Sequence, residues 1–118
     1  MPSSQSDYIL RLIEQLAGAL RRMRERLADG SPADADILRE SEQHQAELFG
    51  PLWPMLRSVD AETAVSLVAD RRRVELWIEF IRFEAEVAES LGDEPRATTA
   101  RERAARLEQQ LEARYPER

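Results

Sequence analysis

The stretch from Arg71 to Leu91 constrains the fold more than any other part of this chain, because its apolar residues fall on two adjacent helical stripes. Together the stripes cover more than half of the circumference of a helix. A helix this apolar must be contacted on two sides, so we expect it at the centre of the domain, with Asp70 as the cap at its start. The stripes consist of Val74, Trp77, Ile78, Ile81, Ala85 and Ala88, and of Leu76, Phe80, Phe83 and Val87.

A second helix should follow this one, running from a cap at Asp93 to about Tyr115. The two are joined at Leu91-Gly92-Asp93, where glycine suits the end of a helix. Small residues on the packing face of the second helix allow a close antiparallel hairpin over residues 71–115. That face consists of Ala97, Ala100, Ala104, Leu107 and Leu111.

The N-terminal region predicts an amphipathic helix over residues 7–27, capped by Ser6 or Asp7. Its apolar stripe is narrow, with charged residues opposite. Such a helix can pack within the chain, pair with another copy, or dock on a different partner. The candidate interaction surface is Ile9, Leu12, Ile13, Leu16, Leu20 and Met23.

The middle of the chain predicts a helix from a cap at Ser31 to about Phe49, followed by two short helical segments, the second capped by Asp60. The apolar face of the longer helix is thin, which places it at an edge. We therefore expect a single all-α domain spanning residues 1–118, with about six helices packed as antiparallel hairpins.

Composition narrows the possible functions. The chain has no Cys, which excludes disulfides, thiolate catalysis and Cys-ligated metal sites. A net charge of −6 disfavours nucleic acid as a partner. No apolar run approaches the ~20 residues that span a bilayer, and no signal peptide is recognisable, so we expect a cytoplasmic protein with no membrane partner.

The charge is uneven along the chain. Residues 1–28 carry five Arg and three acidic residues, whereas residues 29–70 carry nine acidic residues and two Arg. This asymmetry predicts that the first helix lies against the acidic middle of the chain, in the same copy or in another.

The motif from Asp7 to Gln15, Asp-Tyr-Ile-Leu-Arg-Leu-Ile-Glu-Gln, resembles the opening of a family of small, uncharacterised bacterial helical proteins. Those proteins also end in a tetratricopeptide-like hairpin, which this chain matches at Ala85, Gly92, Asp93, Ala97 and Ala104. The chain departs from the tetratricopeptide pattern at Glu84, where Leu is usual, and at Arg101, where a large apolar residue is usual. The resemblance implies the fold and no activity.

Glu84 is the strongest candidate for a functional side chain, since it lies near Trp77 within the apolar face of the helix from Arg71 to Leu91. A carboxylate there must be paired or hydrogen-bonded, or its pKa rises. One interpretation is that an Arg from a neighbouring helix pairs with it, or that it meets water or a second subunit. The other is that Glu84 is a general acid or a ligand-binding group in an apolar pocket.

His44 is the only histidine, and Glu40 and Glu47 share its helix face. A histidine flanked by carboxylates can bind a divalent metal. Helical carboxylate metal sites, however, draw more ligands from facing helices than this chain offers. We therefore predict an ordinary surface histidine and no metal site.

These observations predict a non-enzymatic interaction or assembly module without a cofactor, since no nucleophile elbow or phosphate-binding loop is present. A homo-oligomer, with a dimer as the first expectation, is the predicted assembly, and another protein is a further possible partner. The alternative is a small-molecule or metal-binding helical bundle centred on Glu84, Trp77 and His44.

Overall fold

The computed structural model describes residues 4–30 and 35–116, and within these ranges all regular secondary structure is helical, with no strand. The prediction of an all-α fold is confirmed. The elements are α1 (Ser4–Ala28), α2 (Ala35–Phe49), the 3-10 turn η1 (Gly50–Leu52), α3 (Trp53–Leu56), α4 (Ala61–Val68), α5 (Arg71–Ser90) and α6 (Glu94–Arg114).

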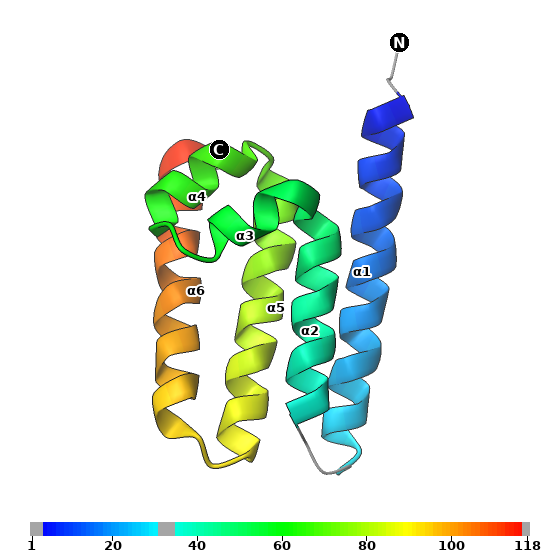
Figure 1. Cartoon of the computed structure of the whole chain (residues 1–118), viewed down its shortest axis with the longest axis vertical. Coiled ribbons are helices and arrows are strands. Elements are labelled where there is room, and N and C mark those ends of the chain that lie inside the picture. Colours follow the sequence, from blue (N-terminus) through cyan, green and yellow to red (C-terminus); the bar gives the residue numbers. More distant parts are fainter. Residues whose placement is uncertain (1–3, 31–34, 117–118) are drawn as a thin grey trace.

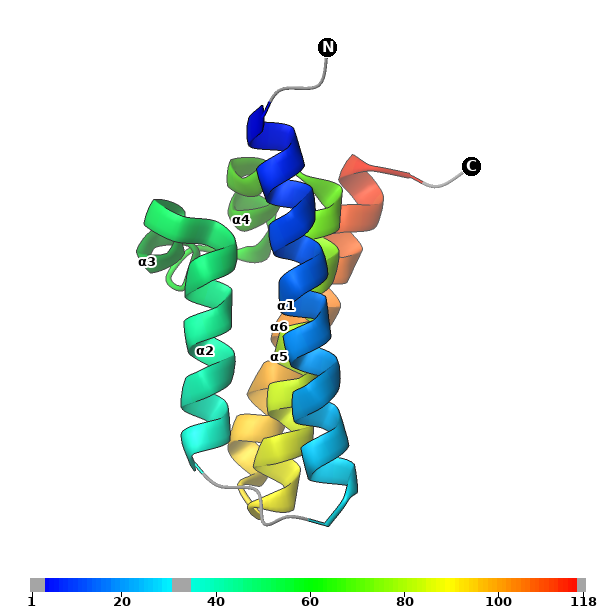
Figure 2. The same cartoon turned by 90° about the vertical axis from the view of Figure 1, so that its right-hand side faces the viewer.

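The four long helices run up and down the long axis of the molecule as two antiparallel hairpins (Figure 1). One hairpin is α1 with α2, and the other is α5 with α6. The short helices α3 and α4 lie together at one end and connect the two hairpins (Figures 1 and 2). Helix α5 contacts α1 and α2 on one side and α6 on the other.

The expected central position of α5 is confirmed by the burial of its side chains. All ten apolar residues of its two stripes are buried, and Val74, Phe80, Phe83 and Val87 are completely inaccessible to solvent. Most of them belong to one continuous hydrophobic cluster that also takes residues from the other helices. Burial of this kind stabilises a fold by roughly 1.5–3 kcal/mol for each large apolar side chain.

The turn between α5 and α6 forms as the sequence indicates. Gly92 adopts a φ of 77°, and its amide donates to the Glu89 carbonyl (3.0 Å) while the Asp93 amide donates to the Ala88 carbonyl (2.8 Å). This pair of bonds ends a helix and requires a left-handed residue, which glycine supplies without steric cost. The Asp93 side chain then caps α6 by accepting from the Arg96 amide (3.2 Å).

Two more of the predicted caps are present, and one is wrong. Asp60 accepts from the Thr63 amide (2.7 Å), and Asp70 accepts from the amides that open α5. Ser6 and Asp7 do not cap α1, because α1 begins at Ser4 and they lie inside its first turn. Asp7 there still complements the positive end of the helix dipole. The cap predicted at Ser31 lies outside the described residues.

Most of the apolar stripe of α1 packs inside the chain, which is one of the three arrangements that the sequence allowed, so its buried members do not form an exposed interaction surface. Its central side chains are buried in the core because α1 contacts both α2 and α5. Only Ile9 and Ile13 of the predicted set are partly exposed. The four buried members are Leu12, Leu16, Leu20 and Met23.

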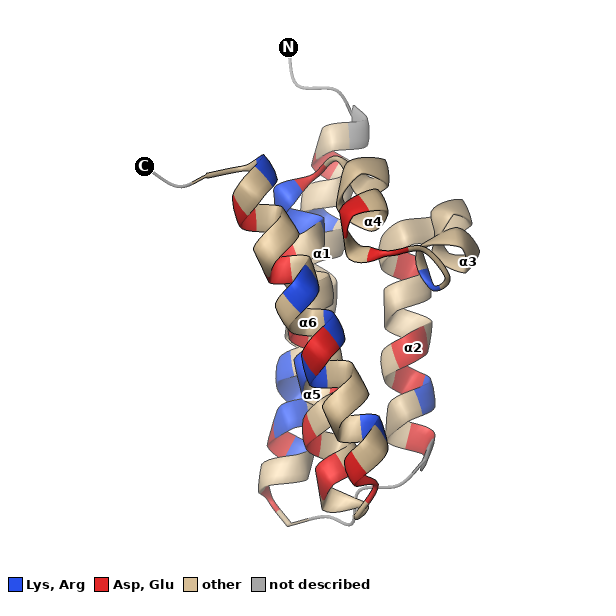
Figure 3. Cartoon of the chain, turned by 90° about the vertical axis from the view of Figure 1, so that its left-hand side faces the viewer, with Lys and Arg blue, Asp and Glu red and all other residues tan. Residues whose placement is uncertain are grey.

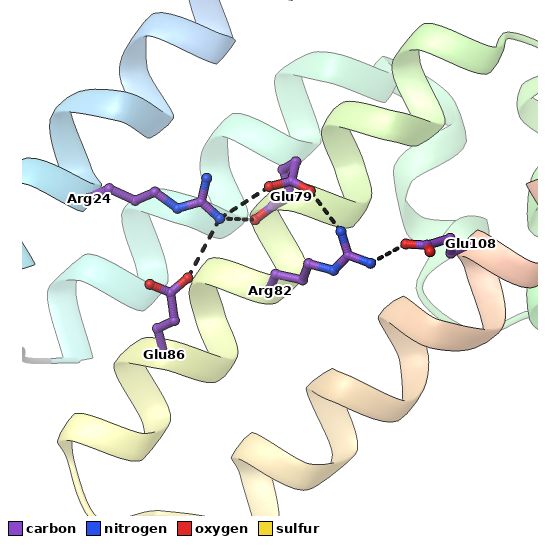
Figure 4. Close-up of polar contacts among 5 residues, drawn as sticks. All are labelled: Arg24, Glu79, Arg82, Glu86 and Glu108. Atoms are coloured by element: carbon purple, nitrogen blue, oxygen red, sulfur yellow. Dashed lines mark hydrogen bonds and ion pairs between the residues drawn. The ribbon is translucent and has the colours of Figure 1, made fainter.

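Exposed ion pairs join α1, α5 and α6 along one side of α5 (Figure 4). Arg24 of α1 pairs with Glu79 (3.3 Å) and Glu86 (3.6 Å) of α5, and Arg82 of α5 pairs with Glu79 (2.9 Å) and with Glu108 of α6. We call these five residues the ion-pair chain. A further pair, Arg26 with Glu40 (3.2 Å), joins α1 to the acidic α2 as the charge asymmetry predicts.

Among the described residues, no helix combines the length and the apolar character that crossing a membrane requires.

Candidate functional site

A cleft of about 550 Å³ lies between α2, α3, α5 and α6. Figure 3 shows α6 and α2 on opposite sides of the view, with α3 beside the upper end of α2. Its volume is within the range of small-molecule sites in proteins. It is lined by Glu42 and Gln45 of α2, by Trp53 and Arg57 at α3, by Trp77, Ile81 and Glu84 of α5, and by Pro95, Arg96, Thr99, Ala100 and Arg103 of α6.

Glu84 lies in this cleft, partly buried, and two neutral side chains of α2 hold one of its oxygens. The Ser41 hydroxyl donates to Glu84 Oε2 at 2.9 Å, and Gln45 Nε2 donates to the same atom at 2.6 Å. Ser41 and Gln45 are themselves buried, with exposed fractions of 0% and 2%. They lie one turn apart on α2 and therefore present the same face to α5.

Gln45 connects Glu84 to the indole of Trp77. Trp77 Nε1 donates to Gln45 Oε1 at 3.1 Å, while Gln45 Nε2 also lies 3.1 Å from Ser41 Oγ. Every polar atom of the Gln45 amide is therefore used, and its orientation is fixed by its neighbours. We call Ser41, Gln45, Trp77 and Glu84 the buried polar cluster.

Burial raises the pKa of Glu84, because a charged carboxylate loses hydration in this environment. The hydrogen bonds from Ser41 and Gln45 and the positive charge of Arg96 oppose this rise, but they do not cancel it. The interpretation that an Arg pairs with Glu84 is wrong for the described residues, where no guanidinium lies within 4.0 Å of its carboxylate. Neutral donors from α2 take that role.

Aromatic rings form the upper part of the cleft. The rings of Trp53 and Trp77 lie 6.2 Å apart at a steep angle, and Phe49 packs edge-on against Trp77 at 5.0 Å. The Arg103 guanidinium sits 5.4 Å from the Trp77 ring centre and donates to the Leu56 carbonyl at 3.0 Å. Burial lowers the pKa of Arg103. Cation–π contact and a backbone acceptor thus position this cation.

Helix α6 supplies the opposite wall from one face. Arg96, Ala100 and Arg103 recur at spacings of four and three, so they line up along the helix beside Thr99. Ala97 and Ala104 of the predicted small-residue stripe are buried against the body of the fold, whereas Ala100 is partly exposed in the cleft. Small side chains at this point leave the space that the cleft occupies.

The structure does not bring His44 together with Glu84 and Trp77. Its ring packs 6.1 Å from the Phe80 ring, and its Nδ1 lies 3.6 Å from Glu47. Because His44 does not line the cleft, the predicted grouping of these three residues is wrong. Across residues 4–30 and 35–116, no three His, Asp or Glu side chains are grouped so that they could hold a metal ion.

Sequence reasoning missed Ser41 and Gln45, although a signal for both was present. The inward positions of α2 recur every three or four residues, and Ser41 and Gln45 continue the pattern that Ile37 begins and Leu48 ends. Polar residues at core positions of a helix indicate a buried polar partner on the helix that it faces. Glu84 is that partner.

The chain matches no protein-family model, no curated protein and no solved structure at a significant level of similarity. The resemblance to a family of small bacterial helical proteins therefore stays a prediction.

Proposed function

We propose that this protein is a non-enzymatic binding module and that the α2–α5–α6 cleft is its site for a small organic molecule. The observation that carries the proposal is Glu84, a carboxylate that faces the cleft with one oxygen held by α2 and the other free of hydrogen bonds among the described residues. A cleft that combines aromatic and aliphatic surface with oriented polar groups is typical of ligand sites.

Binding is favoured over conversion by the composition of the lining. Within the described ranges, Glu84 is the cleft carboxyl without an ion-pair partner, since Glu42 pairs with Arg57 at 3.2 Å. Thr99 supplies a hydroxyl, and no His, Ser or Tyr among the described residues lines the cleft. General acid–base catalysis with a nucleophile needs a second group of that kind within hydrogen-bond reach of the reacting atoms. The residues present can orient and hold a ligand.

The test uses Nile red, an uncharged aromatic dye whose fluorescence rises in apolar sites, and a variant that fills the cleft. Ala100→Leu places a larger side chain in the cleft wall, whereas Ala105→Leu makes the same change roughly 140° around the same helix. We expect saturable binding by the native chain and the Ala105→Leu variant, and binding weakened about tenfold or more by Ala100→Leu. Equal binding by all three proteins would count against the cleft as the site.

As a second candidate, we propose self-association into a dimer through the first turns of α1. These turns project beyond the rest of the molecule (Figure 1), and Tyr8 there is 57% exposed, with Ile9 and Ile13 partly exposed beside it. An antiparallel pair of copies centred on Ile9 would place Asp7 near Arg11 of the partner subunit, as a two-fold interface requires.

Light scattering during size-exclusion chromatography tests this candidate. We expect the native chain to elute as a dimer and the Tyr8→Glu variant as a monomer, with Glu62→Ala, an exposed change on α4, as the matched control. A native chain that stays monomeric at high concentration would rule this assembly out.

A further inference from the structure

We propose that the ligand of the cleft is a small zwitterion of the aromatic amino-acid type, with its ammonium group on Glu84, its carboxylate on Arg96 and its ring against Trp53 and Ile81. This inference rests on the proposed function and adds the chemical class of the ligand. It is carried by the arrangement of charges and apolar groups in the cleft.

The acceptor for the ammonium group is Glu84 Oε1. Ser41 and Gln45 both donate to Oε2, which fixes the carboxylate plane and leaves Oε1 without a partner among the described residues. Glu84 lines the cleft, so this oxygen is available to a ligand. Because an ionised carboxylate only accepts hydrogen bonds, the matching ligand group is a donor, and a cationic donor gives the strongest bond.

The donor for the carboxylate is the guanidinium of Arg96, which lines the same cleft from the first turn of α6. Arg96 forms no ion pair within the described part of the chain, in contrast to Arg57, which pairs with Glu42 at 3.2 Å on the cleft rim. Arg96 is close enough for its charge to lower the pKa of Glu84, yet the two side chains do not touch. Two opposite charges therefore face one space without contacting each other.

A zwitterion satisfies both charges at once, which simpler ions do not. A plain anion near Arg96 and Arg103 would also face the Glu84 carboxylate, and a plain cation near Glu84 would face both guanidinium groups. Like charges that share a partly desolvated cleft repel one another and oppose binding. In an α-amino acid the ammonium and carboxylate groups are attached to the same carbon, so one ligand presents a cation to Glu84 and an anion to Arg96.

The rest of the ligand is apolar and flat. Trp53, Trp77 and Ile81 present rings and an aliphatic chain to the cleft, and Ala100 leaves room opposite them. Aromatic rings prefer offset or edge-on contacts of this kind, which indicates a ring in the ligand. A cleft of about 550 Å³ accommodates a molecule of that size.

The chain itself provides the reporter for a test. It has two tryptophans, and both line the cleft, so selectively excited tryptophan fluorescence responds to events in the cleft. Three probes are titrated: phenylalanine, 3-phenylpropionate without the ammonium group, and phenethylamine without the carboxylate. We expect saturable quenching by phenylalanine, with each truncated probe about tenfold or more weaker, since each loses a charge-assisted hydrogen bond.

Two variants test which side chain binds each charged group of the ligand, and a third variant serves as a control. Arg96→Gln should reduce phenylalanine binding to the level of phenethylamine, and Glu84→Gln should reduce it to the level of 3-phenylpropionate. Arg106→Gln removes an exposed cation from the same helix outside the cleft and should change nothing. Thermal unfolding of each variant verifies that it is folded.

Each outcome separates this inference from the proposed function. If the three probes bind equally well, or if Nile red occupies the cleft and phenylalanine does not, the zwitterion is excluded and the binding site remains. If neither dye nor probe responds to Ala100→Leu, the cleft itself is excluded, and with it the inference.

Discussion

Glu79 and Glu84 stand five residues apart on α5, and each holds neighbouring helices to it by different chemistry. Glu79 belongs to the ion-pair chain and meets two cations, Arg24 and Arg82, at side-chain exposures of 36–43%. Glu84 belongs to the buried polar cluster and meets only neutral donors, the hydroxyl of Ser41 and the amide of Gln45. Both connect α5 to other helices across long sequence separations.

The difference shows why the two regions suit different roles. When an exposed ion pair separates, water solvates both charges. The pair therefore adds little stability, and substitution of either residue is tolerated. A buried carboxylate held by neutral donors has lost hydration without gaining a counter-charge, which leaves it available to a cation from outside the chain. The ion-pair chain thus contributes little to stability, and the buried polar cluster is the region that our proposal assigns to ligand binding.

Removing Gln45 should give the largest effect on stability. Gln45→Leu leaves Glu84 with one donor and the Trp77 indole N–H without an acceptor inside the core. We expect the free energy of unfolding to fall by about 2 to 4 kcal/mol, measured by urea denaturation. Gln43→Leu, on the exposed side of the same helix, is the matched control and should change it by less than about 0.5 kcal/mol. Similar losses of unfolding free energy in both variants would show that the buried polar cluster contributes no more to stability than an exposed glutamine does.

Much of the fold could be predicted from the sequence because its signals are local. The two stripes of α5, the turn at Gly92 and the caps at Asp60, Asp70 and Asp93 depend on neighbouring residues, and all are present. Periodicity and capping chemistry are properties of a single element. They do not depend on which other helix packs against it.

The site was harder to predict because its contacts are not local. The position of Glu84 within the apolar face of α5 indicated a buried carboxylate, but its donors lie 39 and 43 residues earlier in the chain. The same applies to α1, whose narrow stripe fits a partner protein and the chain's own core equally well. His44 was grouped with Glu84 on residue type alone, and the packing of α2 turns it toward Phe80.

A change of pH should distinguish Glu84 from an ordinary surface acid, with an effect smaller than that of Gln45→Leu because its hydrogen bonds can persist. Since the folded pKa of Glu84 is raised, ionisation destabilises the native state as pH rises above the ordinary carboxyl value of about 4.5 through the raised one. Glu84→Gln lacks this titration. The stability of the native chain relative to the variant should therefore fall with rising pH over that window, as measured by urea denaturation at several pH values.

Asp60 serves as a control because the pH dependence of its contribution to stability has the opposite sign to that of Glu84. Hydrogen bonds from Thr63 lower the pKa of this exposed N-cap, so its contribution is present above the ordinary value of 3.8 and is lost as pH falls through the lowered one. Asp60→Asn should remove stability that grows with pH, whereas Glu84→Gln should remove a penalty that grows with pH. The same slope in both variants would show that Glu84 is not desolvated in solution.

The smallest effect is expected in the ion-pair chain. Arg24→Met keeps most of the apolar stem and removes the charge that contacts Glu79 and Glu86 (Figure 4). Exposed pairs of this kind contribute about 0.5 kcal/mol, so the loss of stability should be of that order in dilute buffer. In about 1 M salt the screening length shrinks to roughly 3 Å, and the difference should nearly vanish.

Arg22→Met, an exposed cation of α1 without an ion pair among the described residues, controls for the general change in charge. A loss above about 2 kcal/mol that persisted in high salt would place the ion-pair chain beside the buried polar cluster in importance and overturn the contrast between Glu79 and Glu84.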